Sequence, residues 1–319
     1  MDGANLLRFA NRLRYDAVRG VVAVRDWRVD AAPAWAEFSS AESLARELAA
    51  GLADDGAAYL AGYGLALAAH EWASRPTEPR RAALIQAAAW LRQARPLERR
   101  VGTFLDAALA LADSTLLSGG DAEAAIVAHT AATLSRADRV AERCGRIAAG
   151  LLDDGDELLT LGNASTALGW ALAAGRADDK QLRLILVADA FSTDVPLWME
   201  HIATQLHIPV QRRVSTDGVA GTLCLLTAEH IGMDGSAVVA AGGPALAAQA
   251  RSAGLPCYLV TLDGPDPAIA TSAAFGAADT IVLPAQISAI ITHRGIYRPD
   301  MITRFLGEGD APLDVIPLS

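Results

Sequence analysis

Cysteine and aromatic residues are scarce in this chain. Among its 319 residues only three are cysteines, and aromatic residues make up 5%. Because Cys144, Cys224 and Cys257 form no CxxC spacing, we expect neither a disulfide framework nor a structural zinc site. The sequence also lacks an uncharged apolar run of roughly 18 residues, the length that spans a membrane, and its start has no signal-peptide core. We therefore expect a cytoplasmic protein without a membrane partner.

Several common cofactor and catalytic motifs are missing as well. No GxGxxG follows the first predicted strand of the second half, so a dinucleotide cofactor is not supported, and we expect no cofactor. The absence of a P-loop argues against nucleotide hydrolysis, and no GxSxG elbow is present either. Lysine and arginine number 27 against 37 acidic residues, a formal charge of −10. Such a field repels a phosphate backbone, so nucleic acid is not expected as a direct partner.

Alanine is abundant, and it favours helices because its side chain loses no rotational entropy in a helix. The first half of the sequence reads almost wholly as helix. The segment Ser39-Ser40-Ala41-Glu42 resembles a capping box that begins at Ser39. The nearly all-apolar segment from Tyr59 to Trp72 predicts a buried helix, and Pro76 and Pro79 interrupt the pattern after it. Further helices are expected over 81–93, 97–117 and 122–151, the last with Asp121 as its N-cap.

The pattern changes near Asp153, where short apolar runs begin to alternate with segments of helix length. This alternation is typical of βαβ units and of a mainly parallel sheet. Strands are expected at 157–161, 182–188, 210–214, 222–227, 257–262 and 280–283, and helices at 164–174, 197–206 and 244–252. The sequence therefore predicts an α/β protein. A helical N-terminal domain, residues 1–150, precedes a Rossmann-like domain with a mainly parallel sheet, residues 151–319.

Open parallel sheets bind ligands at the carboxyl ends of their strands, which singles out three loops of this sequence. The loop after the first strand contains Gly162, Asn163, Ser165 and Thr166. Their backbone N–H groups can hold an anion at a helix start, but Asn163 or Ser165 can equally be an ordinary N-cap. In the second loop, Asp189 can bind sugar hydroxyls or cap the next helix.

The third loop brings two carboxylates and an imidazole close together in the sequence. Glu229, His230 and Asp234 could provide general acid and base catalysis if they converge in a cleft. They could also chelate a metal, although HxxxD spacing alone is weak evidence for this. The third alternative is a solvated turn that ends in Asp-Gly.

Four stretches of the sequence share the motifs and the spacing of one known superfamily. Residues 63–68 read YGLALA, residues 74–77 contain RPT, and residues 158–163 lead from Leu-Leu-Thr into an Asn. Near the end, residues 289–299 carry AIIT, RG and RP at the spacing of the superfamily's closing segment. Order and spacing agree from about Ala36 onward. The chain thus resembles the superfamily that joins methylthioribose-1-phosphate isomerase to the regulatory subunits of eukaryotic translation initiation factor 2B.

The resemblance implies a helical domain, a Rossmann-like domain, a homodimer formed through the latter, and a sugar-phosphate or nucleotide-phosphate pocket between the domains. The family's isomerases convert an aldose 1-phosphate to a ketose 1-phosphate with a Cys and an Asp. Here the Cys position is Gly162, and the Asp position is Glu229, which reaches one methylene further. Ala240 occupies the position of the family's Lys. Of the cationic residues that the family uses to hold a phosphate, only one is retained here, as Arg75. Cys144 could supply a thiol instead, although its helical run favours a buried structural role.

Two hypotheses follow from these residues. The first is a diverged sugar-phosphate isomerase-like protein that binds a small sugar phosphate or nucleotide-like ligand. In it Glu229 is the base, assisted by His230, Asp189 or Asp234. The second is a non-catalytic, ligand-sensing protein, because the Cys, the Lys and two Arg of the isomerases are lost. The hydroxyl-rich loop 160–166 also resembles that of the initiation-factor subunits. The sequence leaves open whether the protein is catalytic.

Overall fold

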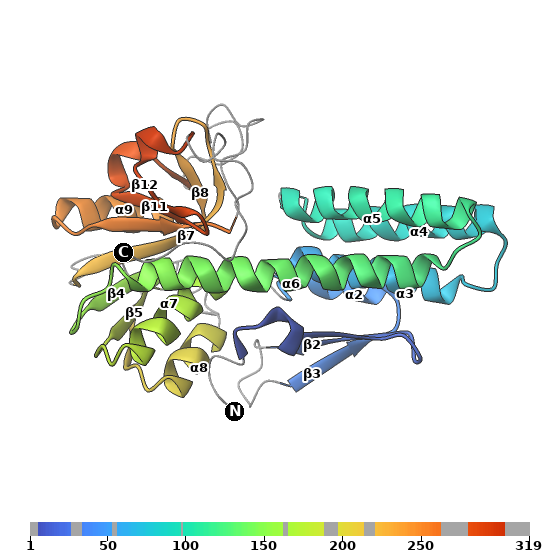
Figure 1. The fold of residues 1–319 in the computed structure, drawn as a ribbon, viewed down its shortest axis with the longest axis horizontal. Coiled ribbons are helices and arrows are strands. Elements are labelled where there is room, and N and C mark those ends of the chain that lie inside the picture. The colour runs from blue at the N-terminus through green and yellow to red at the C-terminus, as the bar shows by residue number, and fades with distance from the viewer. Residues whose placement is uncertain are drawn as a thin grey trace. The chain divides into compact units, whose positions relative to one another are not determined.

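The computed structural model describes residues 6–26, 34–52, 56–96, 98–161, 165–187, 197–213, 221–262 and 280–303. Contacts divide the chain into two units (Figure 1). Residues 8–138 form the first, called the helical unit, and residues 1–7 with 139–319 form the second, called the sheet unit. The division falls inside helix α6, Ala122–Ala149. The domain boundary predicted near Gly150 coincides with the end of this helix and stays a prediction.

The helical unit begins with a three-stranded antiparallel sheet. Strands β1 (Leu13–Asp16), β2 (Val21–Asp26) and β3 (Ala34–Phe38) pair in that order. Burial alternates along β2, where Val22 and Val24 are buried and their neighbours are half-buried. This is the period of two that a sheet with one face on the core requires. The prediction that the first half is almost wholly helical was wrong here. It relied on the abundance of alanine and gave too little weight to the valines at 21, 22 and 24, which form a strand.

The other elements of the helical unit are helices. They are α2 (Ala41–Ala49), α3 (Ala57–Glu71), α4 (Thr77–Ala94), α5 (Arg99–Leu117) and the first part of α6. The N-cap of α2 is Ser40, whose hydroxyl accepts a hydrogen bond from the Ser43 N–H at 3.3 Å, so the helix starts one residue later than predicted. Asp121 caps α6 as predicted and accepts from the Ala124 N–H at 3.1 Å.

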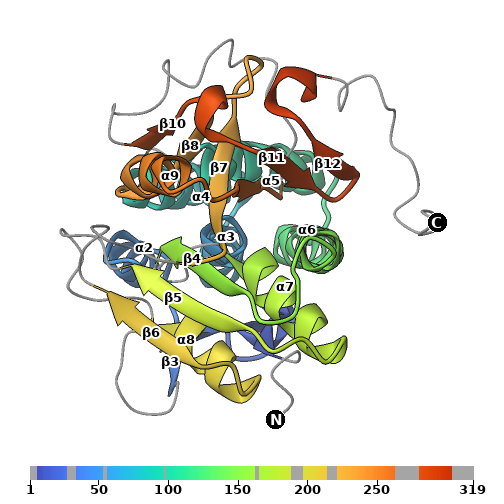
Figure 2. The same cartoon turned by 90° about the vertical axis from the view of Figure 1, so that its left-hand side faces the viewer.

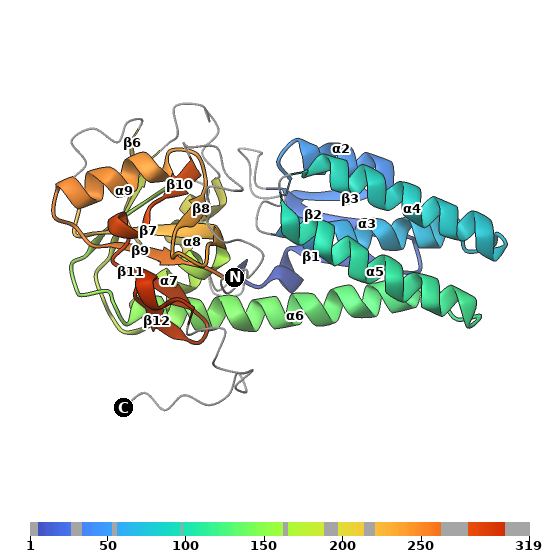
Figure 3. The ribbon, with the colours of Figure 1, turned by 90° about the horizontal axis from the view of Figure 1, so that it is seen from above.

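Helix α3 lies at the centre of the helical unit, with α2, α4 and α5 packed around it (Figure 3). Twelve of its 15 residues are buried, which confirms the buried helix predicted for this segment. Its glycines permit close contact. A Cβ on Gly62 would lie 2.4 Å from the Phe104 ring, and one on Gly64 would lie 2.9 Å from Leu44 and Leu91. Neighbouring side chains therefore occupy the space that larger residues on α3 would need.

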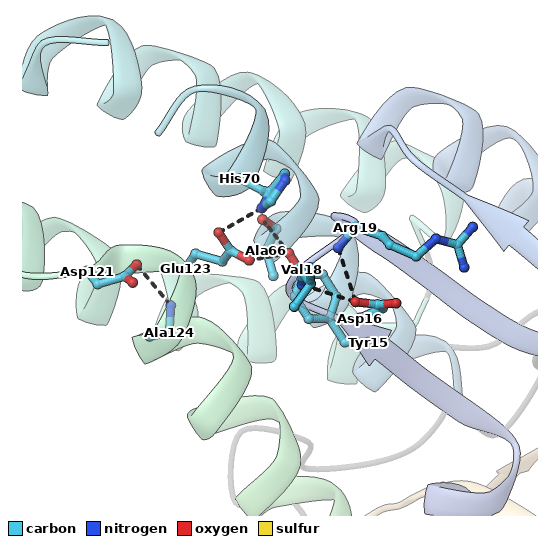
Figure 4. Close-up of polar contacts among 9 residues, drawn as sticks. All are labelled: Tyr15, Asp16, Val18, Arg19, Ala66, His70, Asp121, Glu123 and Ala124. Carbon is cyan, nitrogen blue, oxygen red and sulfur yellow. Dashed lines mark hydrogen bonds and ion pairs between the residues drawn. The ribbon is translucent and has the colours of Figure 1, made fainter. Parts of the chain in front are cut away.

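A polar cluster joins the β1–β2 hairpin to α3 and α6 (Figure 4). The Tyr15 hydroxyl donates to Glu123 Oε1 at 2.8 Å, and His70 Nδ1 lies 3.0 Å from Glu123 Oε2. Burial, followed by the Glu123 hydrogen bond, raises the pKa of Tyr15. Gly20 packs against the His70 ring with a φ of +58°, and a Cβ there would lie 2.2 Å from the ring. The turn therefore requires glycine for both its backbone angle and its space.

A mainly parallel sheet forms the core of the sheet unit. Its strands are β4 (Glu157–Leu161), β5 (Arg183–Val187), β6 (Val210–Arg213), β7 (Leu223–Ile231), β9 (Cys257–Val260), β11 (Ala289–Thr292) and β12 (Gly295–Tyr297). They run in the order β12-β11-β9-β7-β4-β5-β6, with only β12 antiparallel to its neighbour on this path. The connecting helices are α7 (Thr166–Ala177), α8 (Leu197–Gln205) and α9 (Gly243–Ser252). The predicted α/β class and mainly parallel sheet are confirmed.

The chain reverses its direction across the sheet between β4 and β7. From β4 it moves outward to β5 and β6, and it then returns to β7 on the other side of β4, from which β9 and β11 follow. Right-handed crossovers in both directions place α7 and α8 on one face of the sheet and α9 on the other (Figure 2). The carboxyl ends of β4 and β7 therefore flank the crevice where such sheets bind ligands.

Strand β7 continues beyond the parallel sheet into a hairpin. It pairs with β9 as far as Thr227, and further along it pairs antiparallel with β8 (Ala237–Val239). Strand β8 pairs in turn with β10 (Ile281–Val282). The register shifts between Ala228 and His230, a bulge in the strand. The prediction of a loop directly after Thr227 was therefore wrong: the segment is a strand followed by a tight turn. The strand continues because no turn-forming residue occurs before Gly232.

The only lysine in the sequence, Lys180, lies between α7 and β5. Its Nζ donates to the carbonyl oxygen of Ala149 at 2.9 Å and to that of Leu152 at 2.7 Å. Carbonyls at the end of a helix lack partners within the helix, and a cation satisfies them and complements the helix dipole. Lys180 therefore caps the carboxyl end of α6.

Candidate ligand site at the carboxyl edge of the sheet

Two hydroxyl side chains meet where the strand order reverses. Thr227 Oγ1, at the last position of β7 that pairs with β9, accepts a hydrogen bond from the Ser165 N–H at 3.2 Å. The same hydroxyl lies 3.1 Å from Ser165 Oγ and donates to it. Ser165 is 4% exposed and occupies the N-cap position of α7, yet its side chain makes no capping bond to that helix. The side chain instead ties the start of α7 to the end of β7.

Threonines end the neighbouring strands of the same edge. Thr160 is in β4, Thr261 follows β9 and Thr292 ends β11, and none of the three is more than 1% exposed. The Thr261 carbonyl accepts from Cys144 Sγ at 3.4 Å, so the Cys144 thiol is a buried structural group in α6. The Thr292 hydroxyl donates to the Gly295 carbonyl at 3.3 Å. Among the described residues, the three threonines therefore bring neutral hydroxyl groups to this edge.

The start of α9 lies against the end of β4. A Cβ on Gly243 would lie 2.3 Å from Val239 Cγ2 and 3.5 Å from Leu161 Cδ1, so only glycine permits this approach. The chain enters α9 through Gly242 at a φ of +85°, a left-handed conformation that favours glycine. Both α7 and α9 therefore begin at this edge. Their N-terminal dipoles favour negatively charged groups there.

The β7–β8 hairpin carries the three residues predicted for acid–base chemistry. Glu229 lies at the bulge and is exposed, and the half-buried His230 pairs with Val238. Asp234 lies in the turn, where Oδ1 accepts from the Ser236 N–H at 3.0 Å and also from the Ser236 hydroxyl. The turn interpretation therefore describes the contacts of Asp234, while the chemical roles of the three residues stay predictions.

Comparisons with known proteins agree with this architecture. Residues 40–192, just under half of the chain, match a family model described as the initiation factor 2 subunit family. The structure resembles 5-methylthioribose 1-phosphate isomerase from Pyrococcus horikoshii OT3 with a TM-score of 0.73 and 18% identity, over 96% of this chain and 97% of that one. These matches agree with the superfamily resemblance found in the sequence. No curated protein matches the sequence.

The initiation-factor branch of the superfamily is represented as well. The eIF-2B delta subunit from A. fulgidus aligns with a TM-score of 0.68 and 16% identity, over 92% of this chain and 98% of that one. A tetrameric eIF2B-beta2-delta2 complex from C. thermophilum gives a TM-score of 0.59 and 15% identity, over 84% and 93%. Identities this low establish the fold alone, so the superfamily leaves open whether the chain is an isomerase or a regulatory subunit.

Other predicted residues lie elsewhere in the chain. Gly162, Asn163 and Asp189 lie outside the described residues. Thr166 is the first residue of α7 and is fully buried. Arg75 belongs to the helical unit, where it is exposed and its guanidinium lies 6.0 Å from the centre of the Trp72 ring.

Sequence reasoning missed Thr227 and Gly243 as parts of this edge. The signal for Thr227 was a hydroxyl at the end of a predicted strand, and for Gly243 it was a Gly-Gly-Pro at a helix start. Neither signal has meaning until the strand order is known. Among the described residues, no group of three or more His, Cys, Asp or Glu side chains is placed to hold a metal ion. None of the described helices combines the length and apolarity needed to cross a membrane.

Proposed function

We propose that the protein binds a small sugar phosphate or nucleotide-like ligand at the carboxyl edge of its sheet, as a diverged sugar-phosphate isomerase-like protein. The Ser165–Thr227 pair at the reversal of strand order carries the proposal. Ligands of such sheets bind at this crevice. The hydroxyl groups described at this edge suit the hydroxyls of a sugar, and the starts of α7 and α9 suit a phosphate group.

The proposed binding residues combine backbone and side-chain donors. Ser165 and Thr166 are buried, so they would support the ligand through the backbone at the start of α7. The sequence predicts Gly162, Asn163, Asp234 and Arg75 as further ligand-binding residues, and we propose them as positions for mutation. Charge-assisted donors are few in it, because Arg75 alone is cationic. We therefore expect the protein to recognise the hydroxyl groups of its ligand more than the charge of a phosphate dianion.

If the protein is catalytic, aldose–ketose isomerisation requires a base that removes the proton from C2 of the sugar. We assign this role to Glu229, with His230, Asp189 or Asp234 assisting proton transfer to and from the sugar oxygens. The exposed position of Glu229 on a bulge supports the assignment, because bulges next to active sites aim a side chain out of the ladder. Gly162 offers no thiol, so the carboxylate would act without the partner that related isomerases use.

Proton exchange in heavy water tests the catalytic form of the proposal. The protein is incubated with ribose 1-phosphate or methylthioribose 1-phosphate, and loss of the C2 proton signal is followed by NMR. We expect exchange that Glu229→Gln abolishes and that Glu200→Gln, a carboxylate on α8, leaves unchanged. Exchange that persists in Glu229→Gln would remove the base assignment.

The second candidate is a non-catalytic ligand sensor. The loss of the isomerases' Cys, which is Gly162 here, and of their Lys, which is Ala240, favours it, since a sensor needs no group that moves a proton. Calorimetric binding of either sugar phosphate without any C2 exchange would select the sensor over the isomerase. No exchange together with no binding of phosphate, sugar phosphate or nucleotide would refute both. A homodimer formed through the sheet unit stays a proposal that rests on the superfamily.

A further inference from the structure

Helices α4 and α5 form an antiparallel pair whose outer side no other described element of the helical unit covers (Figures 1 and 3). Two ion pairs join the helices. Arg81 binds Asp113 near one end, with a second contact of 3.3 Å between Nη2 and Oδ2. Arg92 Nη2 lies 2.5 Å from Asp106 Oδ1 toward the other end. The outer side thus carries an arginine on α4 beside an aspartate on α5 at two levels.

Apolar side chains occupy the surface around these ion pairs, which we call the α4–α5 face. Ile85 is 62% exposed and Leu117 is 68% exposed. Ala82 and Ala110 are exposed and Ala89 is half-buried. Positions 82, 85 and 89 recur at helical spacing, as do 110 and 117, so each set forms one stripe. The alanines leave room for another backbone to approach closely.

On α4, the exposed apolar position directly follows a buried one in the sequence. Leu84 and Leu91 fill the core side of α4, and Ile85 follows directly after Leu84 in the chain. One exposed apolar residue needs no explanation, but aligned stripes on two neighbouring helices between charged pairs mark an interaction site. Ile85 and Leu117 leave most of their surface exposed within the chain itself.

We propose that the α4–α5 face binds the same face of a second copy of this chain, with the two-fold axis parallel to the helices. Such an axis lays α4 of one copy on α5 of the other. Arg81 then faces Asp113 of the other copy, and Arg92 faces its Asp106, because each intrachain pair lies at one level. An axis across the helices would instead place arginine against arginine. The charges therefore favour the parallel axis. In the resulting four-helix arrangement, each helix runs antiparallel to both of its neighbours.

The size of the face agrees with a reversible dimer. Helix α4 has 18 residues and is about 27 Å long. Two helices, each about 10 Å in diameter, give a face of about 540 Å² per copy. The pair of copies would bury about 1,100 Å² in total, just above the roughly 1,000 Å² that a specific interface requires. The contact is separate from a dimer formed through the sheet unit and from the proposed ligand site.

The mass of the full chain in solution tests this contact. Sedimentation velocity is measured over a concentration series for the wild type and for the double variant Ile85→Arg, Ala110→Arg. The control is Val18→Arg, which changes a residue that is 93% exposed in the same unit but outside the face. We expect the double variant to fall to half the mass of the wild type and the control to keep it. Equal masses in all three proteins, or a wild type that never associates through this face, would overturn the proposal.

A charge exchange tests the contact between the two α4–α5 faces. One chain carries Arg81→Asp and Arg92→Asp, and the other carries Asp106→Arg and Asp113→Arg. Each alone opposes like charges across the two-fold axis, so both should lose association, whereas an equimolar mixture should regain it as a heterodimer. Circular dichroism confirms that the helices persist. Folded chains that stay apart when mixed would refute the proposed contact, and if the exchanged chains do not fold, the Ile85 and Ala110 variant decides.

Discussion

The approach of α6 to α7 at Gly145 allows the sharpest test of the fold that supports the site. A Cβ at this position would lie 2.3 Å from Trp170 Cβ, 2.7 Å from the Ala171 nitrogen and 2.8 Å from the Ala167 carbonyl oxygen. Two of these atoms are backbone, so no rotamer change relieves the contact and α7 itself must move. Gly102, in α5, is the matched control, because its nearest atom would be Arg92 Nε at 4.0 Å.

The expected magnitudes follow from two opposing effects. Alanine is favoured over glycine inside a helix by about 1 kcal/mol at either position. At Gly145 the added atom overpacks the contact, which costs about 1–3 kcal/mol, and the backbone atoms place this site at the upper end. We expect Gly102→Ala to stabilise by about 1 kcal/mol and Gly145→Ala to destabilise by about 2 kcal/mol. At about 2–4 °C per kcal/mol, the melting temperatures should differ by about 6–12 °C.

Urea unfolding and thermal melting measure this difference, and ligand binding reports its consequence. Because α7 begins at Thr166, beside Ser165, its displacement should also weaken the Ser165–Thr227 bond and any ligand affinity that depends on it. Gly102→Ala should leave binding unchanged. If both variants gain stability equally, the close packing of α6 on α7 does not constrain the protein as described.

Three further predictions concern single side chains. Thr227→Val leaves the buried N–H of Ser165 without its acceptor and should cost about 1–3 kcal/mol in urea unfolding, whereas Thr227→Ser should cost less; equal costs would contradict this. Burial raises the pKa of Asp138, so its contribution to stability is greatest below the unfolded pKa and is lost as pH rises through the folded pKa. Asp138→Asn should remove that loss, so its urea unfolding midpoint should depend less on pH than that of the wild type. The same pH dependence in both proteins would disprove the prediction. Tyr15→Phe removes a donor to Glu123 and should cost about 1 kcal/mol by thermal melting, with no change in ligand binding.

Local patterns in the sequence predicted much of the sheet unit. The run at 157–161 is β4, because a continuous apolar segment between Asp and Gly has the length of a buried strand. The Asp121 cap was also predicted, since a cap is a contact between residues three apart. Features that depend on distant pairing were not. Strand β7 continues past Thr227 because β8 offers it a partner, and the residues of β7 alone do not reveal that partner.

The candidate site shows the same limit. Ser165 was identified from its place at a helix start, but its hydrogen-bond partner lies 62 residues further along the chain. That partner becomes a neighbour only because the chain returns from β6 to the other side of β4. The rule that open parallel sheets bind ligands at the carboxyl ends of their strands located the edge. The contacts between its hydroxyls depend on the order of strands, which local periodicity does not encode.

The contacts of Lys180 have a practical consequence for labelling this protein. Arginine guanidinium groups do not react with amine-selective esters, so Lys180 is the single side chain in the sequence that such reagents can modify. Its ammonium is held on the Ala149 and Leu152 carbonyls, so acylation must wait for the end of α6 to open. The acylation rate at this one position, read by mass spectrometry, would therefore measure how often that helix end opens in the otherwise folded protein.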